Sequence, residues 1–370
     1  MTDTRLQSAR LALLLAALLA AGCSDDGPST PTPTAFLDGT EDDPQIGLVV
    51  NSTGKALTLF QLGDPTEIRE IPFGASAAIT PVGFEVRGTS VLVPLGEAAS
   101  VALVDLVDLS VERSFTFPTG NASGAAFADD NTAVIANLID DYVGKVSLTQ
   151  ADDAITDTVS VAPAPTAVVV TGGRALVVSG NLDESFVPIG PGIITVVDLA
   201  TMTPVDTVES GGTNTSAAAI GPDGLLYVVN TGDFVGDGTV TVIDPASVEV
   251  IETVGGFGPG PGAITIDEDG LAYVSGFSTG TVVWDTRTRT FVRDVANAVC
   301  ARLEEEAETP CRGASSAARA SDGSVYQTFF GSAPENLPPY VFVYSATYEL
   351  VDSISAGVGP VAIQIREFGD

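Results

Sequence analysis

The stretch TSAAAIGPDGLLYVVNTGDFVGDGTVTVIDPASVEVIETV, residues 215–254, decides the fold. It holds four short runs of β-branched, aromatic and small apolar residues, at 217–220, 225–230, 239–243 and 248–254. Turn formers separate the runs: GPDG at 221–224, a Gly/Asp-rich loop, and DPAS at 244–247. The runs favour strands, and Asp244 before Pro245 favours a type I turn in which the aspartate accepts hydrogen bonds from the backbone amides ahead of it. The pattern predicts a four-stranded antiparallel meander.

The same opening recurs along the chain in steps of 41, 43, 50, 46, 53 and 46 residues. Its seven occurrences begin at Pro81, Ala122, Pro165, Thr215, Pro261, Ala314 and Pro360. A period of this length with four strands per unit is typical of propeller blades. The 3.6-residue periodicity of helical solenoids is absent. The sequence therefore predicts an all-β propeller of four-stranded antiparallel blades.

The two ends of the repeat region predict how the ring closes. Residues 360–365 repeat only the first strand of a unit, whereas 46–51, 57–61 and 68–72 supply three strands with no first strand before them. Pairing these strands in one shared blade gives seven blades and leaves no open sheet edge. We therefore expect residues 45–370 to form one seven-bladed β-propeller.

Three pairs of predicted strands show a resemblance to known repeats. They are ALVVS at 175–179 with ITVVD at 194–198, LYVVN at 226–230 with GTVTVID at 238–244, and AYV at 272–274 with GTVVWD at 280–285. These segments look like YVTN-type repeats, which occur in the seven-bladed propellers of bacterial surface layers and in YncE-like periplasmic proteins. The resemblance covers about residues 45–370 and implies the fold. It implies little about activity, because the matching residues are strand and turn positions.

Residues 1–22 resemble a lipoprotein signal peptide. Arg5 and Arg10 precede the apolar run at 11–21, which is too short to span a bilayer and ends in Ala-Ala-Gly before Cys23. This lipobox-like sequence implies acylation of Cys23; an ordinary signal peptide cut nearby is the alternative. Residues 23–44, rich in Ser, Thr, Pro and Asp, are expected to form a disordered tether. We expect an extracytoplasmic protein anchored to a bacterial membrane by its lipid, with the outer membrane or cell surface favoured.

Composition excludes several classes of function. The net charge of −33 argues against nucleic acid or an anionic membrane surface as a partner, although acidity also serves solubility in salt-adapted proteins. The chain has no histidine, which excludes Ser-His, Cys-His and His-ligated metal mechanisms. Cys300 and Cys311 bracket an acidic insert and, in an exported protein, are expected to form a disulfide. We expect the chain to be a monomer.

Candidate binding residues lie in the loops between the predicted second and third strands, beside the central channel where propeller ligands usually bind. Six acids occupy these loops: Asp140, Asp141, Asp183, Glu184, Asp233 and Asp237. Their carboxylates could hold Ca²⁺ or attract a basic partner; the alternative is that they only keep the loops hydrated. Arg319, on a predicted first strand, is a candidate for anion binding in the channel or for pairing with a nearby acid.

Two classes of function remain. The first is a tethered binding or scaffold module for a protein or small-molecule ligand, which needs only the fold, the anchor and the loops. The second is a lactonase-like propeller hydrolase with a carboxylate-bound metal. No catalytic residue is predicted, because histidine is absent and Trp284 is the single tryptophan. We favour the binding module.

Overall fold

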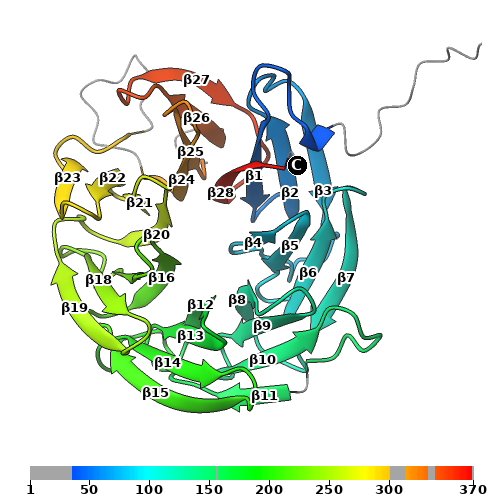
Figure 1. The fold of residues 1–370 in the computed structure, drawn as a ribbon, viewed down its shortest axis with the longest axis vertical. Helices are drawn as coiled ribbons and strands as arrows, with labels where there is room; N and C mark the ends of the chain where they lie inside the picture. Colours follow the sequence, from blue (N-terminus) through cyan, green and yellow to red (C-terminus); the bar gives the residue numbers. More distant parts are fainter. Residues whose placement is uncertain (1–35, 156, 301–312, 332–337, 369–370) are drawn as a thin grey trace, which may run out of the picture. The chain divides into compact units, whose positions relative to one another are not determined.

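The computed structural model describes residues 36–155, 157–300, 313–331 and 338–368. These residues form seven four-stranded antiparallel sheets arranged in a ring (Figure 1). The predicted seven-bladed propeller is therefore confirmed. The predicted acylation site Cys23 and the predicted disulfide partner Cys311 lie outside the described residues. No helix in the described ranges is long and apolar enough to cross a membrane.

Six blades follow chain order from their innermost to their outermost strand. The first three are β4 (Glu85–Arg87), β5 (Ser90–Pro94), β6 (Ser100–Asp105) and β7 (Ser110–Thr116); β8 (Ala122–Phe127), β9 (Thr132–Asn137), β10 (Tyr142–Ser147) and β11 (Asp157–Ser160); and β12 (Pro165–Thr171), β13 (Arg174–Ser179), β14 (Ile193–Asp198) and β15 (Thr203–Glu209). The next three are β16 (Thr215–Ile220), β17 (Leu226–Asn230), β18 (Thr239–Asp244) and β19 (Glu249–Val254); β20 (Pro261–Ile266), β21 (Leu271–Gly276), β22 (Gly280–Asp285) and β23 (Thr290–Arg293); and β24 (Ser316–Arg319), β25 (Val325–Phe329), β26 (Tyr340–Tyr344) and β27 (Leu350–Ile354).

The seventh blade joins the two ends of the repeat region, as predicted. Its innermost strand is β28 (Pro360–Glu367), followed by β1 (Gln45–Asn51), β2 (Ala56–Gln61) and β3 (Ile68–Pro72). β28 runs antiparallel to β1 from the pair Gln45 and Glu367 to the pair Asn51 and Pro360. Figure 1 shows the last strand lying beside the first. The closing blade therefore depends on strands from both ends of the described chain.

An aspartate closes the turn between the third and fourth strands of several blades. In the turn after β18, Asp244 Oδ1 accepts a hydrogen bond from the amide of Ala246 at 2.8 Å. Asp105, Asp198 and Asp285 make the same bond in their blades. This bond confirms the predicted role of Asp244. The side-chain oxygen satisfies a backbone amide that has no partner in a neighbouring strand.

The second strand of three blades ends in a buried asparagine that holds the chain as it passes between blades. Asn51 Nδ2 donates to the carbonyl of Ala356 at 2.8 Å, and Asn137 Nδ2 donates to the carbonyl of Thr119 at 2.9 Å. Asn230 Nδ2 instead bonds the hydroxyls of nearby threonines. A buried amide with satisfied donors fixes the irregular connections to the regular blades.

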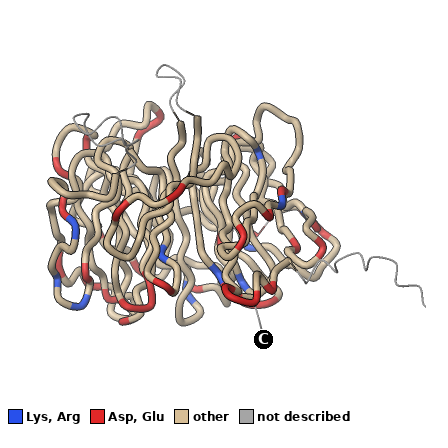
Figure 2. Tube along the Cα trace, turned by 90° about the horizontal axis from the view of Figure 1, so that it is seen from above, with Lys and Arg blue, Asp and Glu red and all other residues tan. Residues whose placement is uncertain are grey.

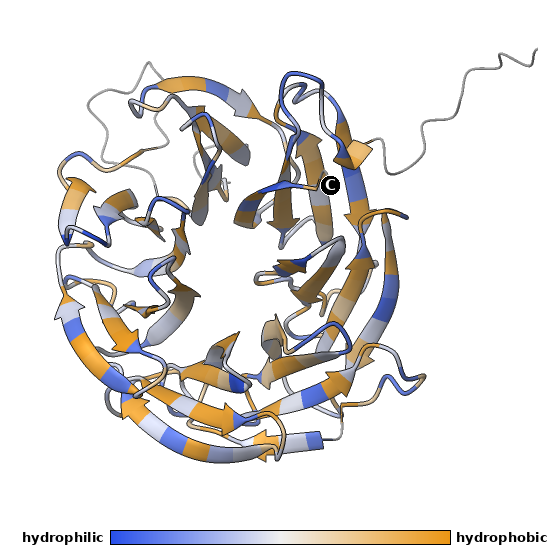
Figure 3. Ribbon diagram, viewed as in Figure 1, coloured by the Kyte–Doolittle hydropathy of each residue, from blue (hydrophilic) through white to orange (hydrophobic). Residues whose placement is uncertain are grey.

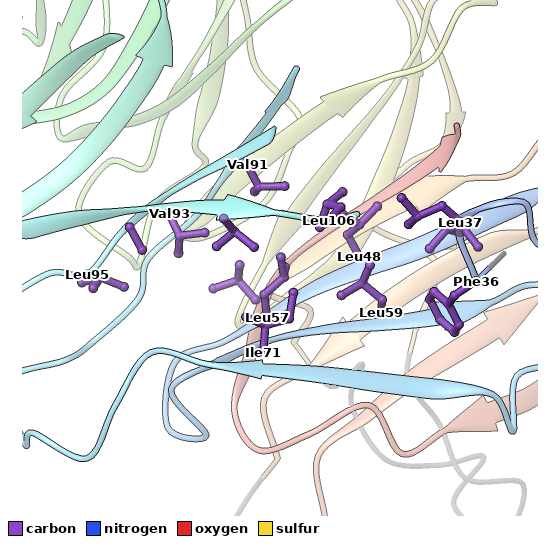
Figure 4. Close-up of a cluster of buried hydrophobic side chains, with 14 of the residues drawn as sticks. Phe36, Leu37, Leu48, Leu57, Leu59, Ile71, Val91, Val93, Leu95 and Leu106 are labelled. Carbon is purple, nitrogen blue, oxygen red and sulfur yellow. The ribbon is translucent and has the colours of Figure 1, made fainter. Parts of the chain in front are cut away.

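The hydrophobic core lies between neighbouring blades, whose middle strands are predominantly hydrophobic (Figure 3). One cluster joins the closing blade to the blade of β4 to β7, with Leu48 and Leu57 facing Val91 (Figure 4). Figure 4 also places Phe36 and Leu37 in this cluster, and both are buried. Such packing leaves no exposed sheet face between the blades.

The predicted tether at 23–44 is wrong over its last part. Gln61 Nε2 donates to the carbonyl of Phe36 at 2.9 Å, and the guanidinium of Arg69 lies 4.9 Å from the centre of the Phe36 ring. Asp43 Oδ1 accepts the amide of Gln45 at 3.0 Å, which leads this segment into β1. The polar composition of the segment obscured one apolar pair, and burial of that pair joins residues 36–44 to the propeller.

Candidate binding face and central channel

Alternating strand direction divides the loops between two faces of the ring. We call the upper face the loops between the second and third strands of each blade together with the connections between blades. The lower face comprises the turns between the first and second strands and between the third and fourth. The six predicted acids all lie on the upper face, whereas Arg319 ends β24 next to the lower face. The structure therefore separates Arg319 from the acids.

Asp140 bonds the connection that enters its blade, and Asp141 bonds the connection that leaves it. Asp140 Oδ2 accepts a hydrogen bond from Thr119 Oγ1 at 2.8 Å. Asp141 Oδ1 accepts the amide of Ala164 at 2.8 Å, in the connection to the next blade. Both carboxylates thus have a structural partner on the upper face.

Asp183 and Asp233 shape their own loops. Asp183 Oδ1 accepts the amides of Ser185 and Val187 at 2.9 and 3.0 Å. Asp233 Oδ1 accepts the amide of Gly236 at 2.6 Å, and this bond is the main cause that lowers the pKa of Asp233. Amide donors stabilise the charged carboxylate, so these acids hold their loops in a defined shape.

Asp237 links two upper-face loops through its carboxylate. Glu184 is exposed. Asp237 Oδ2 accepts the amide of Gly256 at 2.5 Å, and its Oδ1 accepts the amide of Gly258 at 2.6 Å. These two amides belong to the connection that leads to β20. Within the described residues, no group of three or more acids or cysteines is placed to hold a metal ion. The described residues therefore provide no cluster of ligands for the predicted Ca²⁺ site.

Arg319 is engaged by two acids of the lower face. Its Nη1 lies 2.9 Å from Asp269 Oδ2 and 3.0 Å from Asp267 Oδ2. Hydrogen bonds to these carboxylates raise the pKa of Arg319. The sequence left open whether Arg319 binds an anion or pairs with a nearby acid. In the structure Arg319 is paired with acids.

Large apolar side chains project from the upper-face loops of five successive blades. We call this set the apolar crown: Ile139, Phe186, Phe234, Phe277 and Phe330. Phe234 and Phe277 are 64% and 63% exposed, which is unusual for phenylalanine in a folded chain. At least one such residue therefore recurs in the upper-face loop of each of five neighbouring blades, so the feature is repeated around the face and is not a single exposed side chain.

Two members of the apolar crown rest on glycines of the next blade. A Cβ at Gly260 would lie 3.2 Å from the Phe234 ring, and one at Gly359 would lie 3.0 Å from the Phe330 ring. Both glycines have positive φ, of 66° and 68°, a conformation that other residues rarely adopt. Each ring is therefore exposed on one side and supported by backbone on the other.

The upper face is acidic as well as apolar. Among its described loops Lys55 is the single basic residue, and its Nζ donates to the carbonyl of Ser76 at 2.7 Å. Figure 2 shows the basic residues mostly toward the edge of the ring at which the chain ends. Arg87 and Arg289 belong to that side, next to lower-face turns. Both faces carry acids, but most described basic residues lie near the lower face and the exposed phenylalanines lie on the upper face.

A central cavity of about 770 Å³ runs along the innermost strands. Its lining is mostly small and neutral, as in Ser123 and Gly124 of β8, and its described charged residues are Glu85 and Arg366. Burial raises the pKa of Glu85 to about 7, although the amide of Phe127 and the charges of Arg87 and Arg366 oppose the rise. A perturbed carboxyl group in a cavity is a typical feature of functional sites.

Sequence analysis missed the apolar crown and the charged pair in the channel. Phe277 directly follows β21 and Phe330 directly follows β25, and Phe234 interrupts a Gly/Asp-rich loop. An aromatic residue recurring in polar loops was the available signal. Glu85 and Arg366 are charged residues on first strands, the same signal that singled out Arg319.

The fold is a seven-bladed β-propeller whose upper face carries exposed apolar side chains. The chain is similar to hydrazine synthase from Kuenenia stuttgartiensis, with a TM-score of 0.60 and 14% identity over 79% of this chain and 91% of that one. It is also similar to a functionally unknown protein from Desulfotomaculum acetoxidans, with a TM-score of 0.59 and 15% identity over 86% of this chain and 98% of that one. No protein-family model and no curated protein matches the chain. At these identities the similarity shows the fold alone.

Proposed function

We propose that the chain is a binding module that docks a protein partner on its upper face. The observation that carries this proposal is the apolar crown, set among acids. Exposed apolar area that recurs in five blades has no structural use within the propeller, because the blade cores are already closed. Contiguous exposed apolar surface is typical of protein interfaces, and phenylalanine is enriched in them.

The acidic charge of the upper face restricts the kind of partner that can bind there. The acids beside the crown repel phosphates, whether these belong to nucleic acid or to anionic lipid, and the net charge of −33 reinforces this repulsion. A protein segment that carries both basic and apolar side chains complements the face in charge and in hydrophobicity. The proposed partner is therefore a basic, partly apolar protein segment.

The construction of the face supports docking without large rearrangement. Asp237 bonds the connection to the next blade, and Gly260 supports the ring of Phe234. Side chains held before binding lose less conformational entropy when a partner binds. The face is thus pre-organised on the scaffold of the ring.

We also propose that this module works outside the cytoplasm, anchored through acylated Cys23, and that it is related to the YVTN-type and YncE-like propellers. The lipobox-like sequence and the strand segments that end in Asn230 support these proposals. The predicted Cys300–Cys311 disulfide would suit that compartment. Replacing Cys23 by serine should remove acylation and release the protein from membrane fractions, and acylation that persists in the variant would contradict the anchor.

The docking proposal is tested by calorimetric titration with a synthetic peptide of lysine and leucine. The test variant is Phe234→Ser with Phe277→Ser and Phe330→Ser. Since each buried aromatic anchor contributes more than about 1 kcal/mol, we expect the affinity to fall about 100-fold. A lysine–serine peptide and a glutamate–leucine peptide should bind the parent more weakly, because each lacks one half of the complementarity.

The matched control removes exposed apolar residues from outermost strands. Val205→Ser, Ile251→Ser and Val351→Ser change side chains that are similarly exposed, on β15, β19 and β27. This variant should bind the lysine–leucine peptide like the parent. Equal losses in the two variants, or none in either, would place the docking surface elsewhere.

A further inference from the structure

The charged residues that line the central cavity come from neighbouring blades and do not form an ion pair with each other. Glu85 lies on β4 and Arg366 on β28. Their strands meet where Gln364 Nε2 donates to the carbonyl of Phe84 at 3.3 Å, yet no nitrogen–oxygen pair within 4.0 Å joins these two described residues. Two opposite charges that remain apart in a cavity leave room for a ligand between them.

Arg366 is oriented by Gln364. The Oε1 atom of Gln364 accepts hydrogen bonds from Arg366 Nε at 3.1 Å and from Nη2 at 2.9 Å. Gln364 Nε2 donates in turn to the carbonyl of Phe84 at 3.3 Å, which fixes this amide against β4. No described residue accepts a hydrogen bond from Nη1 of Arg366. The guanidinium is thus held in place with donors left for a carboxylate.

The rest of the cavity has space and one further polar group. Its volume of about 770 Å³ lies within the range of small-molecule sites, and its walls are mostly small side chains. Ser315 also lines the cavity and its Oγ has no hydrogen-bond partner among the described residues, but it precedes β24 at the upper end of the channel, whereas Glu85 and Arg366 lie toward the lower end. A ligand site between these two charges therefore rests on Glu85 and Arg366 alone.

We propose that the channel binds a small zwitterion of the amino-acid class. Glu85 receives its ammonium group, and Arg366, oriented by Gln364, receives its carboxylate. An anion would satisfy only the arginine and a cation only the glutamate, whereas a zwitterion satisfies both. This site is distinct from the docking surface, and its existence does not depend on the proposed protein partner.

The test on the parent protein compares ligands that differ in one charge. Alanine and the dipeptide Ala-Ala carry both charges, N-acetylalanine lacks the ammonium, and alaninamide lacks the carboxylate. Calorimetry should show binding of alanine or Ala-Ala, and each single-charge analogue should bind at least about tenfold more weakly. Absence of binding by both zwitterions up to about 10 mM, or equal binding by N-acetylalanine, would overturn the proposal.

The residues are tested by Glu85→Gln and Arg366→Gln, each of which should weaken zwitterion binding about tenfold or more. Arg287→Gln is the control, because Arg287 lies in the exposed turn after β22 and does not line the cavity. It should retain parental affinity. Equal affinity in all three variants would refute the assignment, and the ligand series on the parent decides the question if a variant fails to fold.

Discussion

The upper and lower faces of this propeller use the same kinds of residues for different purposes. On the lower face Arg319 is paired with Asp267 and Asp269, and the turn aspartates accept amides of their own turns. On the upper face acids face almost no bases, and phenylalanines stand exposed beside them. Some acids are therefore paired with arginine on the lower face, whereas the upper face presents its acids beside exposed apolar side chains.

The contrast shows how a ring of repeats separates stability from recognition. Most lower-face turns are short, although the turn between β10 and β11 is longer, and four blades share the same aspartate–amide bond. Upper-face loops differ in length and sequence, as the segments after β13 and β17 show. Variation is tolerated there because the blade cores do not depend on the loop tips.

Removing the strand that closes the ring should unfold the propeller, so that neither face is formed. A chain truncated after Val358 lacks β28, whose Ile363 is buried, and exposes an edge of β1. We expect loss of a cooperative transition, on the order of the whole 5–15 kcal/mol that stabilises a folded domain. Thermal unfolding of the two chains is the measurement. An unchanged melting temperature would contradict the closure.

Asp237 sharpens the contrast, because it is an upper-face acid with a structural role. Asp237→Ala removes the acceptor of two amides, from Gly256 and Gly258, and should lower the free energy of unfolding by about 1.5–3 kcal/mol. Glu184→Ala is the control, since Glu184 is exposed and should change stability little. Urea unfolding of both variants checks this. Equal stabilities would mean that the connection to β20 does not need Asp237.

Glu85, in the channel that links the faces, should make stability depend on pH. Because burial raises its pKa from 4.5 to about 7, the folded state binds more protons than the unfolded state between these values. Stability should therefore fall as the pH rises through this window, by about 1–2 kcal/mol after allowance for solvent screening. Glu85→Gln should remove this part of the slope in urea unfolding. An identical slope in parent and variant would contradict the raised pKa.

The sequence predicted the blades well because strand and turn signals are local. The unit that contains Asn230 and Asp244 recurs with the period of a four-stranded propeller blade. The incomplete units at the two ends supply together the four strands of one shared blade. Phe36 and Leu37 were missed since their burial depends on the distant Leu59 and Leu106 of the same cluster.

The candidate site was harder to predict. The upper-face acids were identified by residue type, but their amide partners, such as Ala164 for Asp141, come from connections with no recognisable pattern. The ion pair between Arg319 and Asp267 likewise joins two blades. Whether Arg319 pairs with an acid or is free to bind an anion depends on this distance in the folded chain, which the sequence does not give. Glu85 and Arg366 are far apart in sequence and share a cavity only because the ring closes.

The most direct test of the two-face account measures peptide affinity and unfolding free energy on the same two variants. The upper-face variant carries Phe234→Ser, Phe277→Ser and Phe330→Ser, and the lower-face variant carries Arg319→Ala, which leaves the partly buried Asp267 without its cation. The account predicts about 100-fold weaker binding of the lysine–leucine peptide with nearly parental stability for the first. For the second it predicts parental binding with a loss of about 1–2 kcal/mol of stability. If the lower-face variant lost affinity at parental stability, or the upper-face variant lost stability and kept its affinity, the assignment of the faces would be contradicted.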